Sequence, residues 1–220
     1  MKILKVSGVL HENDKSQLDL GTREKIIDVA NEQFIQLGVR YVTMDDIARA
    51  AGVSKKTIYQ EFDDKGRLVY ESFKSSLDKD QVFFETLHKE VSCPIEHFVL
   101  ISKYIRSRFA KINPLVFSEI QRYYPESWKL LQDFRNNCAV KTITEVINSG
   151  KAKGYFRSEI NADILAMIRM DQISGIFDPG RFSSSEYNIL DIQMTVMDHF
   201  IHGLLTDKGR ELFYKINNQD

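Results

Sequence analysis

A short segment of the sequence gathers side chains whose chemistry suits nucleic-acid recognition. The segment, Thr43 to Phe62, reads TMDDIARAAGVSKKTIYQEF. Its outstanding hydrogen-bonding residues are Lys55, Lys56, Thr57, Tyr59 and Gln60. Lys reaches the O6 and N7 atoms of guanine, Gln pairs with adenine, and the methyl group of Thr contacts thymine. These residue types therefore suit a DNA major groove.

Two short helices are expected to position those side chains. Thr43 caps the first, and Asp46 follows in place of the usual Glu of a capping box. The apolar residues of this helix share one face and are Met44, Ile47, Ala48 and Ala51. Gly52 permits the turn, and Ser54 begins the second helix. Two short helices joined by such a turn form a helix-turn-helix.

The second helix is expected to point its polar side chains away from the protein. Ile58 is the residue of this helix that faces the core. Since a helix rotates by about 100° per residue, Lys56 and Gln60 lie near the side opposite Ile58. Thr57 and Tyr59 flank them, so all four side chains face solvent or a groove.

A preceding helix completes a compact segment over residues 22 to 68. Thr22 is a suitable N-cap, and Gly38 ends the helix, where a left-handed conformation costs Gly little. The apolar stripe of this helix consists of Ile27, Ala30, Phe34 and Leu37. The polar residues 1 to 21 are expected to be an N-terminal tail or a short arm.

Net charge does not decide whether this segment binds DNA. The chain of 220 residues has a formal net charge of −1, and basic and acidic residues are equally numerous over residues 22 to 68. Positive charge is concentrated only locally, at Lys55 and Lys56. Electrostatics alone leaves DNA binding and an ordinary solvated helix face equally open.

The order of residues over the segment resembles a known family. Residues 22 to 69 are similar, without a gap, to the N-terminal DNA-binding domain of the TetR (tetracycline-repressor) family of bacterial transcription regulators. The residues that carry the resemblance are Gly38, Thr43, Ile47, Ala48, Ala51, Gly52, Val53, Ser54, Thr57, Tyr59, Phe62, Lys65 and Leu68. The resemblance implies base or phosphate contacts from Lys55, Lys56, Thr57 and Gln60. It implies contacts to the DNA backbone from Thr43, Tyr59 and Lys65.

Acidic residues depart from the family pattern. Glu61 stands where most relatives have His or Tyr, and Asp63 and Asp64 follow shortly after. A carboxylate near a phosphate backbone is unfavourable because like charges repel. Glu61 is therefore expected either to point away from DNA or to lower the affinity for it.

Residues 69 to 220 are expected to form a second, helical domain. Apolar spacing predicts helices over about 68–88, 95–112, 126–151, 162–177 and 186–205, with short helices that break near Pro114 and Pro125. The chain is therefore predicted to be all-α, with about nine helices.

The resemblance implies a role for this second domain. It implies that the domain binds a small-molecule effector, and that its last two long helices, over 162–177 and 186–205, form a four-helix dimer interface with a second subunit. An apolar stripe runs along the later helix, through Ile189, Ile192, Val196, Phe200 and Leu204. The sequence leaves open whether this stripe packs within the subunit or across the dimer.

Aromatic residues are the candidates for an effector pocket, which is expected to accept an apolar or amphipathic molecule. They are Tyr104, Phe117, Tyr123, Tyr124, Trp128 and Phe134. Met167, Met170 and Gln172 of a later helix are further candidates. Aromatic residues at helical spacing also make an ordinary core, so that alternative stays open.

Other classes of protein find little support. The N-terminus does not form a signal peptide, and no run approaches the roughly 18 apolar residues of a membrane helix, so a cytoplasmic protein without a membrane segment is expected. Cys93 and Cys138 form no CxxC pair and are expected to be reduced thiols. Asp198, His199 and His202 lack a further ligand for a metal site. Without a catalytic motif, neither an enzyme nor a cofactor is expected.

These observations predict a homodimeric, ligand-responsive transcription regulator, most simply a repressor that a small molecule releases from a palindromic operator in double-stranded DNA. The alternative is a helical dimer that binds a ligand or a protein partner and has weak affinity for DNA. Glu61 and the balanced charge of residues 22 to 68 motivate this alternative.

Overall fold

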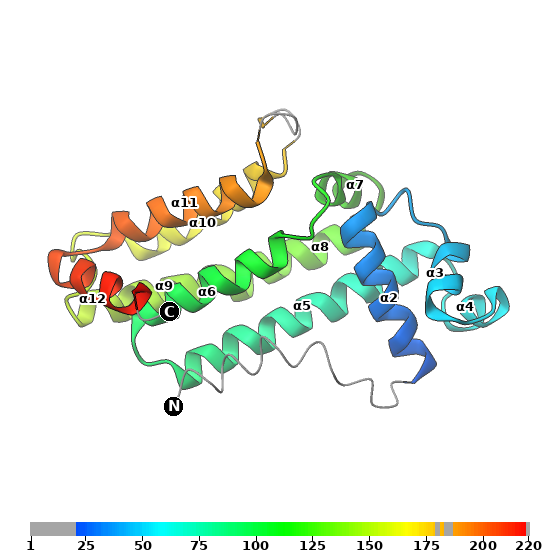
Figure 1. Ribbon diagram of the computed structural model, residues 1–220, viewed down its shortest axis with the longest axis horizontal. Coiled ribbons are helices and arrows are strands. Elements are labelled where there is room, and N and C mark those ends of the chain that lie inside the picture. The colour runs from blue at the N-terminus through cyan, green and yellow to red at the C-terminus, as the bar shows by residue number, and fades with distance from the viewer. Residues whose placement is uncertain (1–20, 179–180, 183–186, 219–220) are drawn as a thin grey trace. The chain divides into compact units, whose positions relative to one another are not determined.

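The computed structural model describes residues 21–178, 181–182 and 187–218, and it confirms the all-α class. The helices are α2 (Thr22–Leu37), α3 (Met44–Ala51), α4 (Lys55–Glu61), α5 (Lys65–Glu90), α6 (Pro94–Phe109), α7 (Leu115–Tyr123), α8 (Pro125–Phe134), α9 (Val140–Ala152), α10 (Ala162–Ile176), α11 (Ile189–Leu204) and α12 (Asp207–Asn217) (Figure 1). Within the described ranges, extended pairing is limited to one antiparallel bridge between Phe156 and Leu205. None of the described helices has both the length and the apolar character needed to cross a membrane.

Two features of the described residues go beyond the expectation of about nine helices. The helix expected over 126–151 is divided into α8 and α9 by a π-helical turn, Arg135–Ala139. The other feature is α12, whose N-cap Thr206 accepts the Gly209 N–H. Gly is a poor helix former, but a Cβ at Gly209 would lie 2.1 Å from the Tyr155 carbonyl oxygen. Close packing at this site therefore requires Gly, and the sequence pattern hides the helix.

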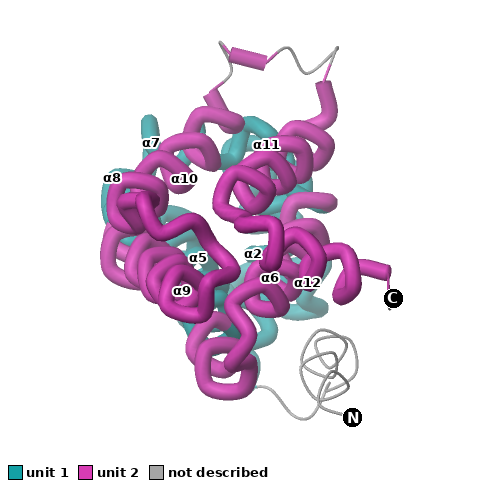
Figure 2. The backbone as a smooth tube through the Cα atoms, turned by 90° about the vertical axis from the view of Figure 1, so that its left-hand side faces the viewer, with its two compact units in different colours: residues 1–83, 111–132 teal, residues 84–110, 133–220 magenta. Residues whose placement is uncertain are grey.

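The chain divides into two compact units. The first comprises the described residues up to Phe83 together with Lys111–Gln132, and the second comprises Phe84–Ala110 together with the described residues from Asp133 onward (Figure 2). This division differs from the expected boundary between residues 68 and 69, because α7 and most of α8 belong to the first unit. Of the expected tail or arm, residues 1 to 21, all but Gly21 lie outside the described residues.

The core of the first unit joins the three N-terminal helices to the start of α5. Phe34 of α2, Ile47 of α3 and Ile58 of α4 have no exposed surface. Ala48 is small and buried, and Gly52 ends α3 in the left-handed region, with φ 67° and ψ 32°. The expected helix-turn-helix is therefore present, with the predicted inward residues.

Helix α7 belongs to the same core although it lies far along the chain. Val116 and Ile120 of α7 are 1% and 0% exposed in this cluster. The Asn113 N–H donates to the Ile35 carbonyl oxygen at 2.7 Å, and the Arg40 N–H donates to Glu119 Oε2 at 3.0 Å. Helix α7 thus anchors the end of α2 and the loop that follows it.

The core of the second unit is formed by contacts of α6, α9, α10, α11 and α12 (Figure 2). The ring of Phe98 lies 5.8 Å from that of Phe156 and 6.0 Å from that of Phe200, measured between centroids. The Phe200 stripe on α11 includes Ile192 and Leu204, which are also buried. Ile192, Phe200 and Leu204 of the predicted stripe therefore pack within the subunit, whereas Ile189 and Val196 are half-buried.

One buried histidine gives the second unit a dependence on pH. His97 of α6 is 2% exposed, and neither ring nitrogen has a hydrogen-bond partner in the part of the chain that the structure describes. Burial lowers the pKa of His97 from 6.5 to about 4, with a smaller contribution from His88, whose ring centroid lies 6.3 Å away. The folded protein thus holds His97 neutral under conditions in which the unfolded chain takes up a proton.

We expect His97→Leu to flatten the loss of stability in acid. Because the unfolded state binds more protons between pH 6.5 and about 4, the contribution of His97 to stability is complete above pH 6.5 and is lost as the pH falls. The loss amounts to about 3 kcal/mol over the whole window. Urea unfolding at several pH values measures it, with exposed His199→Leu as the control. Parallel pH profiles for the wild type and His97→Leu would contradict this expectation.

Candidate DNA-binding surface

The N-terminus of α3 is held by the predicted capping box. Thr43 Oγ1 accepts the Asp46 N–H at 3.1 Å, and Asp46 Oδ2 accepts the Thr43 N–H at 3.1 Å. The Thr43 hydroxyl also donates to Asp46 Oδ2 at 2.6 Å, and this bond is the main cause of the lowered pKa of Asp46. Thr43 is exposed, but its hydroxyl proton is already engaged. A phosphate contact from Thr43 therefore requires its hydroxyl to exchange partners.

Helix α4 begins with a second cap. Ser54 Oγ accepts the Thr57 N–H at 3.0 Å and lies 2.8 Å from Thr57 Oγ1. This arrangement occupies the Thr57 hydroxyl and leaves its methyl group as the part suited to a thymine contact. The cap thus orients one of the predicted contact residues.

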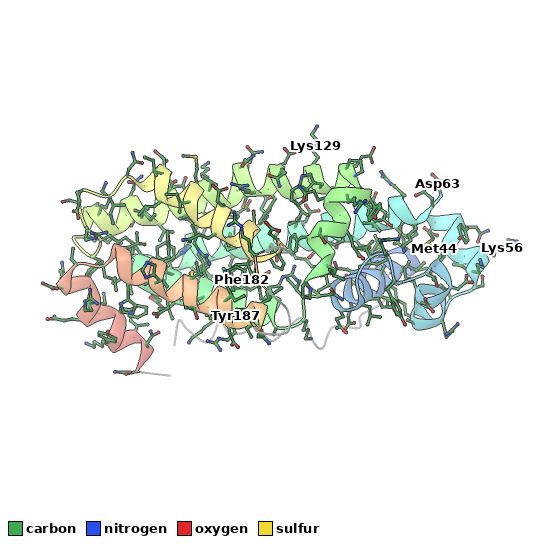
Figure 3. All side chains as sticks on the ribbon, turned by 90° about the horizontal axis from the view of Figure 1, so that it is seen from above. Met44, Lys56, Asp63, Lys129, Phe182 and Tyr187 are labelled. Atoms are coloured by element: carbon green, nitrogen blue, oxygen red, sulfur yellow. The ribbon has the colours of Figure 1, made fainter. Side chains whose placement is uncertain are left out.

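The outward face of α4 agrees with the predicted geometry. Ile58 is fully buried, whereas Lys55, Lys56 and Gln60 are exposed. Tyr59 is 46% exposed. Figure 3 shows the Lys56 side chain projecting away from the neighbouring helices of its unit. The structure therefore places these side chains together on one surface, which we call the α4 face and define as Lys55, Lys56, Thr57, Tyr59 and Gln60.

The two lysines of the α4 face differ in their availability. Lys55 Nζ lies 2.8 Å from Asp45 Oδ1 and donates to Asp45 Oδ2 at 3.0 Å. The hydrogen bond to Asp45 raises the pKa of Lys55. Within the described part of the chain, Lys56 has no ion pair. Lys56 is therefore the readier of the two to meet a phosphate or a base.

Lys65 is held at the first position of α5. Its Nζ lies 6.0 Å from the centroid of the Phe34 ring, and burial is the main cause of its lowered pKa. Half-burial limits the reach of this side chain, so its predicted contact with the DNA backbone is a contact at short range.

The acidic residues after α4 have distinct positions. Asp64 Oδ1 accepts the Arg67 N–H at 2.7 Å, so this carboxylate caps the N-terminus of α5. Asp63 is exposed and is labelled in Figure 3. Glu61 is exposed at the last position of α4. Of the departures from the family pattern, Asp64 therefore has a structural role, whereas Glu61 remains the carboxylate adjoining the α4 face.

The aromatic candidates for an effector pocket do not form one cluster within either unit. Phe117, Tyr123, Tyr124 and Trp128 belong to the first unit, whereas Tyr104, Phe134, Met167 and Met170 belong to the second. Tyr124 and Trp128 pack against the core of the first unit, and burial raises the pKa of Tyr124. Tyr123 is 44% exposed and lies under the guanidinium of Arg40, with 4.8 Å between the guanidinium carbon and the ring centroid. Tyr124 and Trp128 therefore contribute to the core that holds α2, α3 and α4 together.

The candidates of the second unit are also divided. Phe84 lies 6.1 Å from Tyr104 and 6.2 Å from Phe134 between ring centroids, so it links these two residues in one aromatic group. Met167 is 49% exposed. The outward position of Met167 places it away from the interior in which a pocket residue is expected.

Sequence reasoning missed three buried polar residues of the second unit, His97, Arg169 and Gln193. Apolar residues surround Arg169 in the sequence, as in ILAMIRMDQI, so helical periodicity does not reveal which face of α10 is buried. The available signal was Arg169 itself, the single basic residue of α10, with apolar residues on both sides of it.

Metal-binding geometry is absent from the described residues, which contain no group of three or more His, Cys, Asp or Glu that could hold an ion. His202 Nε2 instead lies 3.6 Å from Asp198 Oδ1, one turn away on α11.

Known proteins resemble this chain in sequence and in fold. Residues 26–72 match the family described as bacterial regulatory proteins, tetR family. The HTH-type transcriptional repressor KstR2 of Mycobacterium tuberculosis is 25% identical over 147 residues, which cover 65% of this chain and 73% of that protein. The probable acrEF/envCD operon repressor of Escherichia coli is 21% identical over 210 residues, which cover 86% of this chain and 90% of that protein.

The fold matches that of solved regulators. The structure of a TetR-family transcriptional regulator from Agrobacterium tumefaciens superposes with a TM-score of 0.69 at 19% sequence identity. The superposition covers 84% of this chain and 98% of that one.

We expect Asp45→Asn to increase the salt dependence of DNA binding. The substitution releases Lys55 from its ion pair, and each additional phosphate neutralised contributes about −0.9 to the slope of log K against log salt. Fluorescence anisotropy with a DNA duplex at several salt concentrations measures the slope. Asp63→Asn removes the same charge from an exposed residue and serves as the control. Equal slopes for the two variants would show that Lys55 gains no phosphate contact.

Proposed function

Because the chain belongs to the TetR family of bacterial regulatory proteins, we propose that it is a homodimeric transcription repressor that a small molecule releases from its operator. The observation that carries this proposal is the α4 face, in which polar side chains project from a capped helix whose opposite side is fixed by buried Ile58. Transcription regulators of this family are not enzymes, and we propose no catalytic activity for this chain. Its place of action is the cytoplasm, where a bacterial operator is found.

The proposed DNA contacts follow from the accessibility of each side chain. Lys56 and Gln60 read base edges in the major groove, and the methyl group of Thr57 contacts thymine. Tyr59 contacts a phosphate at the margin of the α4 face, with Lys65 and Thr43 as further backbone contacts. Lys55 contacts a phosphate only where it leaves its ion pair with Asp45. In a symmetric dimer, two copies of α4 would meet half-sites about 34 to 36 Å apart on a palindromic operator.

The proposed dimer interface lies on α10. Ile164, Met167 and Ile168 have exposed fractions of 49%, 49% and 44%. Their spacing of three and four residues places them on one face of the helix. An exposed apolar stripe of this kind suits a contact with a second copy of the chain. Met167 is therefore better explained as a dimer contact than as a pocket residue.

Release from the operator is a coupling between two binding sites. An effector that binds the second unit more tightly in one dimer geometry shifts the protein toward that geometry. Operator affinity falls if the two α4 helices then no longer match their half-sites. Helix α5 is the proposed carrier, because it begins in the first unit at Lys65 and continues past Phe83 to Glu90.

A second candidate function rests on Glu61. This exposed carboxylate adjoins the α4 face, where it would repel phosphate. The alternative is a helical dimer that binds a ligand or a protein partner and has weak affinity for DNA. A flat salt dependence of DNA binding would favour it.

Operator selection tests the proposed function. Ligand-free protein is incubated with random duplex DNA, and the retained duplexes are sequenced. We expect a palindromic motif, and we expect Lys56→Ala and Tyr59→Ala each to weaken its binding by about tenfold or more. Lys129→Ala is the matched control, because this exposed lysine of the same unit lies well away from Lys56 (Figure 3). Failure to enrich any motif at low salt would favour the alternative function.

The dimer interface is tested separately. We expect Met167→Glu to shift the protein from dimer to monomer, because a carboxylate buried in an apolar contact is strongly unfavourable. Analytical ultracentrifugation measures the shift. Val82→Glu is the control, since Val82 of α5 is also an exposed apolar residue, at 61%. A dimer that survives Met167→Glu would place the interface elsewhere.

A further inference from the structure

Helix α10 buries a guanidinium group among apolar side chains. Arg169 is 1% exposed and is one of the largest side chains in the protein to be fully enclosed. Its Nη2 lies 3.6 Å from Met197 Sδ, and its guanidinium carbon lies 5.9 Å from the centroid of the Phe200 ring. Sulfur is a weak hydrogen-bond acceptor, and a ring face attracts a cation only modestly. These neighbours therefore satisfy Arg169 only in part.

No carboxylate among the described residues compensates this charge. Over the described part of the chain, Arg169 forms no ion pair, and its Nη1 atom has no hydrogen-bond partner. Burial lowers the pKa of Arg169 to about 10, so the group still carries its charge at neutral pH. A buried charge without a partner is costly, and proteins commonly pair it with an opposite charge. The Nη1 side of the guanidinium could therefore accept an anionic partner.

Two amide side chains within one helical turn of Arg169 or of its neighbour Met197 have atoms without a hydrogen-bond partner among the described residues. Helices α10 and α11 lie side by side and run in opposite directions (Figure 1). Gln193 lies one turn before Met197 on α11 and is fully buried, and within the described ranges neither its Oε1 nor its Nε2 has a hydrogen-bond partner. Gln172, one turn beyond Arg169 on α10, leaves Oε1 unpartnered as well. The antiparallel arrangement places both amides on the same side of Arg169.

We propose that Arg169 and Gln193 bind the carboxylate of a small acid with an apolar body, and that this acid is the effector of the protein. A carboxylate accepts two parallel hydrogen bonds from one guanidinium, and Gln193 Nε2 supplies a third donor. The apolar body is matched by the aromatic surroundings, because Phe200 contacts Phe98 at 6.0 Å between centroids. The effector role rests on the proposed function, whereas the binding site does not.

An acid at Arg169 would bind one state of the protein more tightly than another. Arg169 is enclosed in the structure, so an acid reaches it only when α10 and α11 rearrange. The acid supplies the missing charge in the rearranged state and therefore favours that state over the closed one. The outer face of α10 holds the proposed dimer contacts, so the same movement alters the geometry of the dimer.

Binding of carboxylates tests the proposal directly. The probes are straight-chain acids from acetate to palmitate together with benzoate, and each is paired with its neutral primary amide. Thermal unfolding and titration calorimetry are measured on the intact dimer at neutral pH. We expect at least one acid to raise the melting temperature while its amide does not. We expect Arg169→Met to weaken the binding of that acid by about 100-fold.

Matched variants separate binding from folding. Arg106→Met changes an exposed arginine of α6 and should leave the affinity unchanged. Arg169→Met removes an uncompensated charge, so it should fold at least as well as the wild type. Should Arg169→Met fail to fold, Gln193→Leu carries the test with an expected loss of about tenfold. The proposal is overturned if no acid stabilises the wild type, if amides bind as tightly as acids, or if the variants bind as tightly as the wild type.

Operator binding without ligand distinguishes this inference from the proposed function. An acid that binds through Arg169 to a protein that retains no DNA supports the site and contradicts the regulator. An operator bound without any acid-binding site supports the regulator and overturns the site. Release of the selected operator by the same acid, lost in Arg169→Met, supports both.

Discussion

The burial of Ile58 is the contact on which the DNA-binding surface depends. Helix α4 has seven residues, too few to be stable alone in water, so it exists because Ile58 packs against the first unit. That single contact also sets the rotation of the helix about its axis. Lys56 and Gln60 face outward as a consequence, and the caps at Thr43 and Ser54 fix where each helix begins.

The second unit follows a different principle. It has an aromatic core around Phe98 and Phe200, yet it also encloses His97, Arg169 and Gln193, which have buried polar atoms without a hydrogen-bond partner among the described residues. Such groups reduce stability unless something else satisfies them. A regulator benefits from this cost, since a tightly satisfied interior offers no free energy to a ligand.

Local patterns allowed the first unit to be predicted closely from the sequence. Thr43, Gly52 and Ser54 signal helix ends through chemistry within a few residues, and Ile58 is found by helical spacing alone. The addition of residues 111–132 to that unit could not be predicted, because it depends on contacts between distant parts of the chain. The buried face of α10 was equally hidden, since apolar residues surround Arg169 on the helix.

The packing of α7 against the first unit has a consequence for how such proteins diversify. Val116 and Ile120 complete the core that they share with α2, α3 and α4. Glu119 accepts the Arg40 N–H and so fixes the backbone there. Recombination at residue 68 would therefore join α2, α3 and α4 to a foreign α7 and leave the core of the first unit mismatched. A functional chimera must inherit residues 111–132 together with the N-terminal helices. Two stretches that are separated in the gene thus form one structural unit that recombination has to keep together.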